Sequence, residues 1–238
     1  MMMPALVWVA EHKGGIVAVA RYLVDKVPDQ VRIAFRHVAQ VCKTTGINQV
    51  TLIVPQKGSW DRTIVAEFLG QRVAKALLKG QPVQLIDGVS MTLESAQTFR
   101  TTTHQGLLIG AHISVKDMNK LDDSWGAQAI VYLPWNDTEG KEWQATWRAE
   151  VIGVEREAVP RSSLSMPVED ALRRLTEIIN LGTGLGHPSD KKHAERTIGQ
   201  LRDDGHSFDP VEVRRWAQRN GWSSGAAAAL EAIASRRG

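Results

Sequence analysis

Between residue 5 and about residue 154, short apolar runs alternate with longer segments of helical periodicity, and this alternation restricts the fold more than any other feature. The runs are nearly continuous in apolar character, as in strands that are covered on both faces. They span residues 5–10, 50–54, 83–86, 106–110 and 127–133. Residues 149–154 alternate more and are expected to form an edge strand.

The segments between these runs have the spacing of helices with one apolar face. Helices are expected over residues 16–26, 31–43, 63–78, 91–99, 116–121 and 139–147. Asp61 is expected to cap the helix over 63–78. Because neighbouring parallel strands require crossover helices, the sequence predicts an α/β fold. The expected form is a Rossmann-like doubly wound, mainly parallel sheet of five or six strands.

A polar stretch without periodicity, residues 156–166, is interpreted as a linker. It divides an α/β domain over residues 1–155 from a small all-helical C-terminal module over residues 167–238. In that module, Asp209, Pro210 and Glu212 have the spacing of a capping box at the start of a helix. That helix and the next one, which begins at Ser223 or Ser224, are predicted to form a helix-turn-helix-like corner.

The composition excludes several classes of protein. The 238 residues contain one cysteine, Cys42, which excludes a disulfide framework or a cysteine-rich zinc module. The longest apolar run is much shorter than the roughly 20 residues that span a bilayer, and the first residues lack the features of a signal peptide. We therefore expect a cytoplasmic protein without a membrane partner. The formal net charge of +3 does not by itself indicate a nucleic-acid partner.

In open parallel sheets, ligands bind beyond the carboxyl ends of the strands. Polar, glycine-rich loops follow the predicted strands, and a small anionic ligand is one expected partner. The ligand-binding candidates are His12, Lys13, Gly14, Gly15, Lys57, Ser59, Asp61 and Asn136. Asp87, His112 and Asp137 are candidates for acid–base chemistry, although a catalytic role is left unassigned. No phosphate-loop or dinucleotide pattern occurs at the first turn, and the identity of any cofactor is left open. No metal site is predicted.

Basic side chains on the C-terminal helices are candidates for nucleic-acid contacts. They are Lys191, Lys192, Arg196, Arg214, Arg215 and Arg219. Acidic side chains lie between them in the sequence, as on an ordinary solvated helix face.

Residues 209–222, DPVEVRRWAQRNGW, resemble the helix and Asn-Gly turn in the DNA-binding tail of actinobacterial nucleoid-associated silencers. The resemblance extends over residues 209–233. It implies a two-helix unit that, in that family, inserts an Arg-Gly-Arg hook into the minor groove. Here residues 223–227 are SSGAA, so the hook is missing, and the helix-turn-helix form could serve DNA or protein contacts.

Three functional hypotheses follow. The leading one is a homodimeric regulator or sensor that binds a ligand or partner through the α/β domain and docks duplex DNA or a protein through the helical module. The alternative is an enzyme acting on a nucleotide-like or phosphorylated substrate, with Lys13 and Lys57 binding anions and His112, Asp87 or Asp137 as acid or base. The second alternative is a structural interaction protein without a ligand.

Overall fold

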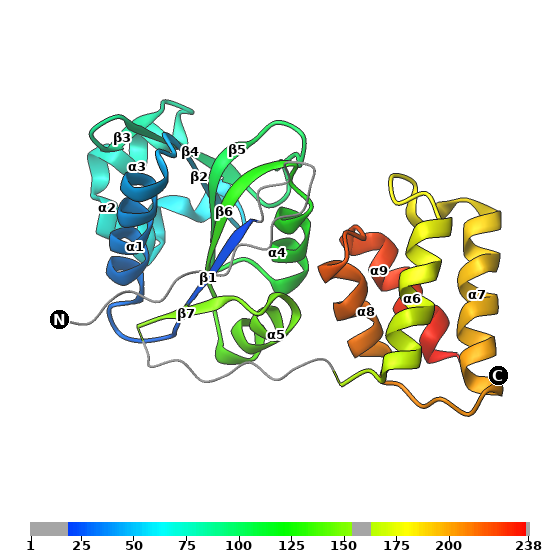
Figure 1. Cartoon of the computed structure of the whole chain (residues 1–238). Coiled ribbons are helices and arrows are strands. Elements are labelled where there is room, and N and C mark those ends of the chain that lie inside the picture. Colours follow the sequence, from blue (N-terminus) through cyan, green and yellow to red (C-terminus); the bar gives the residue numbers. More distant parts are fainter. Residues whose placement is uncertain (1–18, 154–162, 237–238) are drawn as a thin grey trace.

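A computed structural model describes residues 19–153 and 163–236. A seven-stranded sheet runs through it in the order β3-β4-β2-β5-β6-β1-β7 (Figure 1). The strands are β1 (Ala20–Val24), β2 (Gln49–Val54), β3 (Val83–Ile86), β4 (Val89–Ser95), β5 (Gln105–Ala111), β6 (Gly126–Leu133) and β7 (Glu150–Ile152). All neighbours pair in parallel except β3, which is antiparallel to β4. The predicted α/β class with a mainly parallel sheet is confirmed, with more strands than expected.

Helices cover both faces of this sheet. The helical elements before β7 are α1 (Gln30–Thr45), the 3-10 helix η1 (Lys57–Arg62), α2 (Ile64–Leu69), α3 (Gln71–Leu78), α4 (Val115–Asp122) and α5 (Asp137–Trp147). Figure 1 shows α1, α2 and α3 on one side of the sheet and α4 and α5 on the other. Within β2, Leu52 and Val54 join the core under α1–α3, whereas Ile53 joins the core under α4 and α5. Both faces are buried, which explains the continuous apolar runs.

The helix predicted over residues 16–26 is wrong, because residues 20–24 form strand β1. This strand pairs with β6 on one side and β7 on the other. Arg21 fixes it further: its Nε lies 2.7 Å from Oδ1 of the fully buried Asp122 carboxylate, whose other oxygen accepts a 2.8 Å hydrogen bond from Trp143 Nε1. Contacts about a hundred residues away along the chain override the local helical spacing. The strand predicted over 5–10 lies outside the described residues.

The helix predicted over residues 91–99 is also wrong, because β4 occupies most of this segment. Burial alternates along β4, with Met91 and Leu93 buried and Thr92 and Glu94 less so. The pattern has the period of a strand, and the turn at Gly88, whose φ is 77°, folds β3 back onto β4.

One long helix was expected over residues 63–78, but the chain forms two. Gly70 separates α2 from α3 with a φ of 82°. The N-cap is Thr63, whose hydroxyl accepts a hydrogen bond from the Ala66 amide, and not Asp61, which lies within η1. The other strands and helices expected between residues 31 and 152 form close to their predicted positions.

Residues 163–236 form helices α6 (Met166–Ile178), α7 (Pro188–Asp203), α8 (Pro210–Arg219) and α9 (Ser224–Ser235), with a 3-10 turn, η2 (Gly184–Gly186), before α7. They pack around a common apolar core that includes Leu172, Ile198, Trp216 and Leu230. Asp209 caps α8 by accepting a hydrogen bond from the Val211 amide, as predicted. The predicted capping-box partner, Glu212, pairs with Arg215 instead.

Within residues 19–153 and 163–236, no helix combines the length and the apolar content that a membrane span requires.

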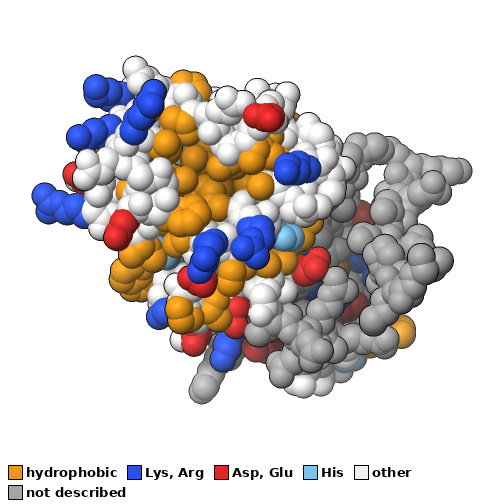
Figure 2. All heavy atoms as spheres, turned by 90° about the vertical axis from the view of Figure 1, so that its left-hand side faces the viewer, with side chains coloured by type: hydrophobic (Ala, Val, Ile, Leu, Met, Phe, Trp, Pro, Cys, Tyr) orange, Lys and Arg blue, Asp and Glu red, His pale blue; other side chains and the backbone are white. Residues whose placement is uncertain are grey.

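Three hydrophobic side chains on α2 and α3 are exposed to solvent: Ile64, Phe68 and Leu78. Figure 2 views the molecule from the α1–α3 side and shows hydrophobic side chains gathered on that face.

Candidate ligand-binding cleft at the sheet edge

The carboxyl ends of β1 and β6 lie side by side, because the two strands are parallel neighbours. After β1 the chain continues into α1 on one face of the sheet, and after β6 it continues into α5 on the other face. The two connections therefore diverge at this edge. Such a divergence is where open parallel sheets usually hold their ligands.

A cleft of about 570 Å³ lies at this point. Its walls come from the ends of β1 and β6, from α5 and from β7. The lining residues are Leu23, Val24, Asp25, Lys26, Pro134, Asp137, Gly140, Lys141, Gln144 and Val151. The volume falls within the range of about 300–1,000 Å³ that is typical of small-molecule sites.

Local hydrogen bonds fix the walls of the cleft. Asn136 caps α5: its Oδ1 accepts a 2.9 Å hydrogen bond from the Glu139 amide, which places Asp137 in the first turn. At the back, the buried Gln30 amide donates to the carbonyl oxygens of Val24 (3.1 Å) and Pro134 (3.5 Å). Gln30 therefore ties the end of β1 to the end of β6. Asn136 was predicted to bind a ligand, and in the structure its side chain caps α5.

His112 follows β5 beside this cleft. Its backbone has a φ of 55°, a left-handed conformation that non-glycine residues seldom adopt, and its amide donates a 2.8 Å hydrogen bond to the Leu133 carbonyl. The imidazole meets Trp135 edge-on, with the ring centroids 5.3 Å apart. Burial lowers the pKa of His112, and the nearby positive charge of Lys26 lowers it further. The ring is therefore neutral around pH 7.

Of the strand-end candidates, the structure brings Asn136, Asp137 and His112 to this edge. Asp25, Lys26 and Lys141 complete the charged lining, and sequence reasoning missed all three. Asp25 and Lys26 directly follow β1, so recognising that strand is the signal that would have found them.

Other candidates lie elsewhere. Lys57 and Ser59 follow β2, which β5 separates from β6; Lys57 Nζ lies 3.4 Å from Glu94 Oε2, and Ser59 Oγ accepts a 3.5 Å hydrogen bond from Gln56. Asp61 lines a separate cavity against α2 and α3. His12, Lys13, Gly14 and Gly15 lie outside the described residues.

Asp87 was expected at the same edge as the other strand ends, and this expectation is wrong. Asp87 lies in the turn between β3 and β4. Because β3 is antiparallel, its carboxyl end faces the starts of the parallel strands. Asp87 is therefore at the opposite edge of the sheet from His112 and Asp137.

The three arginines on α8 that were candidates for nucleic-acid contacts have partners within the protein. Arg214 lies 3.1 Å from Glu142 of α5 and 3.4 Å from Glu231 of α9. Arg215 pairs with Glu212, and Arg219 donates to the Ala145 and Thr146 carbonyls of α5. Burial lowers the pKa of Arg219, as does nearby Arg148, although Arg219 stays charged. By contrast, Lys191, Lys192 and Arg196 on α7 are exposed.

Helix α5 belongs to two sites at once. Asp137, Gly140 and Gln144 line the sheet-edge cleft, while Thr138 and Ala145 line a second cavity of about 560 Å³ between α5 and α8. Lys141 borders both cavities.

A further contact joins α4 to α9. Asp123, at the end of α4, accepts hydrogen bonds from the Ser224 amide (2.9 Å) and hydroxyl (2.6 Å) at the start of α9. Burial raises the pKa of Asp123, and these hydrogen bonds lower it.

Comparisons with known proteins concern only the C-terminal helices. Residues 166–237, the segment that contains α6–α9, match a family model described as "Domain of unknown function (DUF1889)". Neither the curated proteins nor the solved structures include a significant match to the chain. The similarity thus names no activity, and the resemblance of residues 209–233 to a silencer tail stays a prediction.

The described residues show no group of three or more His, Cys, Asp or Glu side chains that could hold a metal ion. The groups that could bind a ligand in the cleft are two lysines, two aspartates and the first turn of α5. Lysines and helix N-termini bind anionic groups, and carboxylates accept hydrogen bonds from ligand donors.

Proposed function

We propose that this protein is a ligand-responsive regulator, in which a Rossmann-like domain binds a small polar ligand and the C-terminal helical module docks a partner. One observation carries the proposal: α5 lines the sheet-edge cleft and also holds α8. A ligand bound in the cleft contacts the helix on which the C-terminal helices rest.

The charges in the cleft support a ligand with both an anionic group and a hydrogen-bond donor. Lys26 and Lys141 favour the anionic group, and so does the N-terminus of α5, whose dipole is positive at that end. Asp25 and Asp137 favour a hydroxyl, amide or amine. A small phosphorylated or carboxylated metabolite with such a donor fits this combination.

The contacts of α5 provide the physical route from ligand to partner. A ligand changes a conformational equilibrium only if it binds one arrangement better than another. Pulling Lys141 toward the cleft would displace α5 relative to α8, where Glu142 meets Arg214 and where Arg219 binds the last carbonyls of α5. Ligand binding would thereby alter the position or the stability of the C-terminal helices.

A thermal-shift screen of nucleotides, sugar phosphates and amino acids tests the first half of the proposal. A ligand is expected to raise the melting temperature, since binding at about 100 times its Kd stabilises the native state by about 2.7 kcal/mol. The shift is expected to be lost in Lys141→Ala and kept in Lys79→Ala, a matched control at an exposed lysine after α3. An equal shift in both variants would place the ligand elsewhere, and no shift with any compound would favour the interaction-protein hypothesis.

Hydrogen exchange tests the second half. Ligand binding is expected to change the protection of amides in α8 and α9 as well as in α5. Arg214→Ala, which removes the contact with Glu142, is expected to keep ligand binding and to weaken the response of α8. A response confined to α5 would contradict the proposed coupling.

An enzyme at the same edge is the second candidate, and the left-handed, neutral His112 favours it. A neutral imidazole can accept a proton from a substrate, and strained backbone conformations often occur in active sites. Asp137, which lines the cleft, is the second acid–base candidate. Any ligand found in the screen is to be incubated with wild type and with His112→Gln, and the products analysed by mass spectrometry. Turnover that His112→Gln abolishes, while binding persists, would establish this function.

A homodimer and a cytoplasmic location belong to the same proposal. Light scattering of the purified chain distinguishes a 26.3 kDa monomer from a dimer. Fractionation of cells that produce the chain tests its location.

A further inference from the structure

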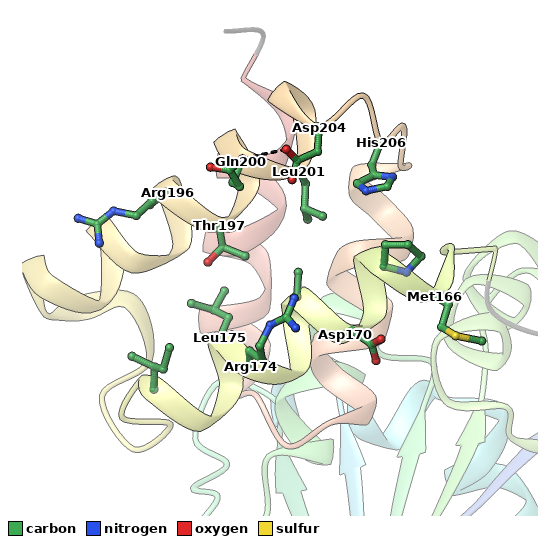
Figure 3. A pocket seen from close by; sticks show the side chains of 13 residues that line it. Met166, Asp170, Arg174, Leu175, Arg196, Thr197, Gln200, Leu201, Asp204 and His206 are labelled. Atoms are coloured by element: carbon green, nitrogen blue, oxygen red, sulfur yellow. Dashed lines mark hydrogen bonds between the residues drawn. The ribbon is translucent and has the colours of Figure 1, made fainter.

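A groove of about 610 Å³ separates α6 from α7 on the C-terminal helices (Figure 3). Leu175 and Leu201 form its floor and are buried. The side chains of Met166 and Ile178, at the two ends of α6, border it and are 77% and 59% exposed. Together with the apolar floor, these side chains form an apolar surface with a polar rim, which is typical of protein interaction sites.

The shape of the groove follows one face of α6. Met166, Asp170, Arg174 and Ile178 are spaced four residues apart, so they share one side of the helix. At about 1.5 Å per residue, the exposed apolar ends lie about 18 Å apart. An elongated, open groove of this length suits a helix of about three turns. A small-molecule site, in contrast, buries 70–90% of its ligand.

The charges of the groove change sign along its length. Figure 3 shows Arg196 of α7 toward one end, Arg174 of α6 near the middle and pointing between the helices, and Asp170 toward the end where Met166 lies, with Asp204 on the opposite wall. In the part of the chain that the structure describes, neither arginine has an ion-pair partner. Asp204 accepts a hydrogen bond from Gln200, and Asp170 pairs with Arg173.

We propose that this groove docks an amphipathic helix of a partner protein, and that the helix lies parallel to α6. Its apolar stripe covers Met166, Ile178 and the floor. Its last turn carries carboxylates that meet Arg174 and Arg196, and its first turn carries Lys or Arg that meets Asp170 and Asp204. The helix dipole favours the same direction, because its positive end meets the aspartates and its negative end the arginines.

Duplex DNA suits this groove less well. The two aspartates would repel phosphates, and the exposed apolar ends would stay uncovered. The inference names the partner in the proposed function. It involves no residue of the sheet-edge cleft, so the two can fail separately.

The test is a selection of displayed peptides on the full-length chain without added ligand. The peptides have about three helical turns, with Leu at positions i, i+4 and i+7 and with Glu, Lys, Gln or Ala at the other positions. Selected peptides are expected to carry Glu in the last turn and Lys in the first. The best of them, made with a fluorescent label, gives a Kd by anisotropy.

Two double variants with the same change in net charge distinguish the effect of charges in the groove from the effect of charges elsewhere on α7. R174E with R196E is expected to weaken this peptide at least about tenfold, a loss of about 1.4 kcal/mol, and to reverse the charge preference of a repeated selection. K191E with K192E, at exposed positions outside the groove, is expected to change the Kd by less than about twofold. Circular dichroism checks that both variants keep their helices.

Three results of the peptide experiments would overturn the inference. They are no enrichment of any peptide, enrichment without the predicted order of charges, and equal weakening by both double variants. Salt-dependent binding of duplex DNA that only R174E with R196E abolishes would also overturn it, because the groove would then serve nucleic acid. A ligand-induced thermal shift that R174E with R196E leaves intact would show that the sheet-edge site is independent of this result.

Discussion

The C-terminal helices present two contrasting surfaces. The inner surface faces α4 and α5, and there Arg214, Arg219 and Ser224 bind Glu142, carbonyl oxygens and Asp123. The outer surface is the α6–α7 groove, where Arg174 and Arg196 have no ion-pair partner among the described residues and Met166 and Ile178 are exposed.

The difference shows that an arginine's role depends on what its helix packs against. On α8, the Arg219 guanidinium donates hydrogen bonds to carbonyl oxygens near the end of α5, and Arg214 pairs with Glu142. On α6 and α7 the same residue type extends into an open groove and is available to a partner. Basic character along the sequence is similar in both places, so only packing distinguishes a structural arginine from one that can bind.

The largest effect is expected from a substitution at Gly184, which tests whether the C-terminal helices depend on the close packing of η2 against α9. Gly184 has a φ of 56°, and a Cβ there would lie 2.6 Å from the Ala226 Cβ of α9. Gly184→Ala is therefore expected to destabilise the protein by about 2–4 kcal/mol in urea unfolding. Gly186→Ala is the matched control, since nothing lies within 4 Å of its added Cβ. Equal stability of the two variants would mean that η2 packs loosely on α9.

The next largest effect is expected in a pH titration, at the buried Asp122, which directly precedes Asp123 of the inner surface. Burial raises the pKa of Asp122 from 3.8 to about 6, despite the opposing influence of Arg21. Because the folded state binds this proton more tightly, Asp122 contributes stability fully below pH about 3.8 and loses that contribution as the pH rises through about 6. The change is on the order of 1–3 kcal/mol.

The measurement is urea unfolding of wild type and Asp122→Asn between pH 4 and pH 8. Wild type is expected to lose stability relative to the variant as the pH rises, whatever constant offset the substitution adds. A difference between the two that does not vary with pH would contradict the raised pKa.

A smaller effect is expected from removing one arginine of the inner surface. Arg214→Ala leaves Glu142 and Glu231 without their partner, but both are partly exposed and can regain water. The expected loss is about 1–2 kcal/mol in the free energy of unfolding. A change of less than about 0.5 kcal/mol in the free energy of unfolding would show that Arg214 contributes no more than an ordinary solvated side chain.

The smallest effect is expected in the groove. Arg174→Ala and Arg196→Ala are each expected to change the free energy of unfolding by no more than about 0.5 kcal/mol, because neither side chain has an ion pair to lose within the described residues. The same urea titrations measure this. A loss as large as that of Arg214→Ala would erase the contrast between the two surfaces.

Sequence reasoning located much of the fold but only part of the site. It found β2, β5 and β6 from their continuous apolar character, and it placed Asn136, Asp137 and His112 at the ends of strands. It missed Lys26 because β1 was taken for part of a helix. It misplaced Asp87 because nothing in residues 83–86 reveals whether that strand runs parallel or antiparallel.

What the sequence determined by itself is local. Continuous apolar runs specify strands buried on both faces, and Asp209 specifies the start of α8, because a cap requires only residues within one turn. Tertiary structure decided that residues 20–24 form a strand, which edge of the sheet receives each loop, and which arginines are engaged. These outcomes depend on pairs such as Arg21 with Asp122 and Arg214 with Glu142, whose free energy appears only when distant parts of the chain meet.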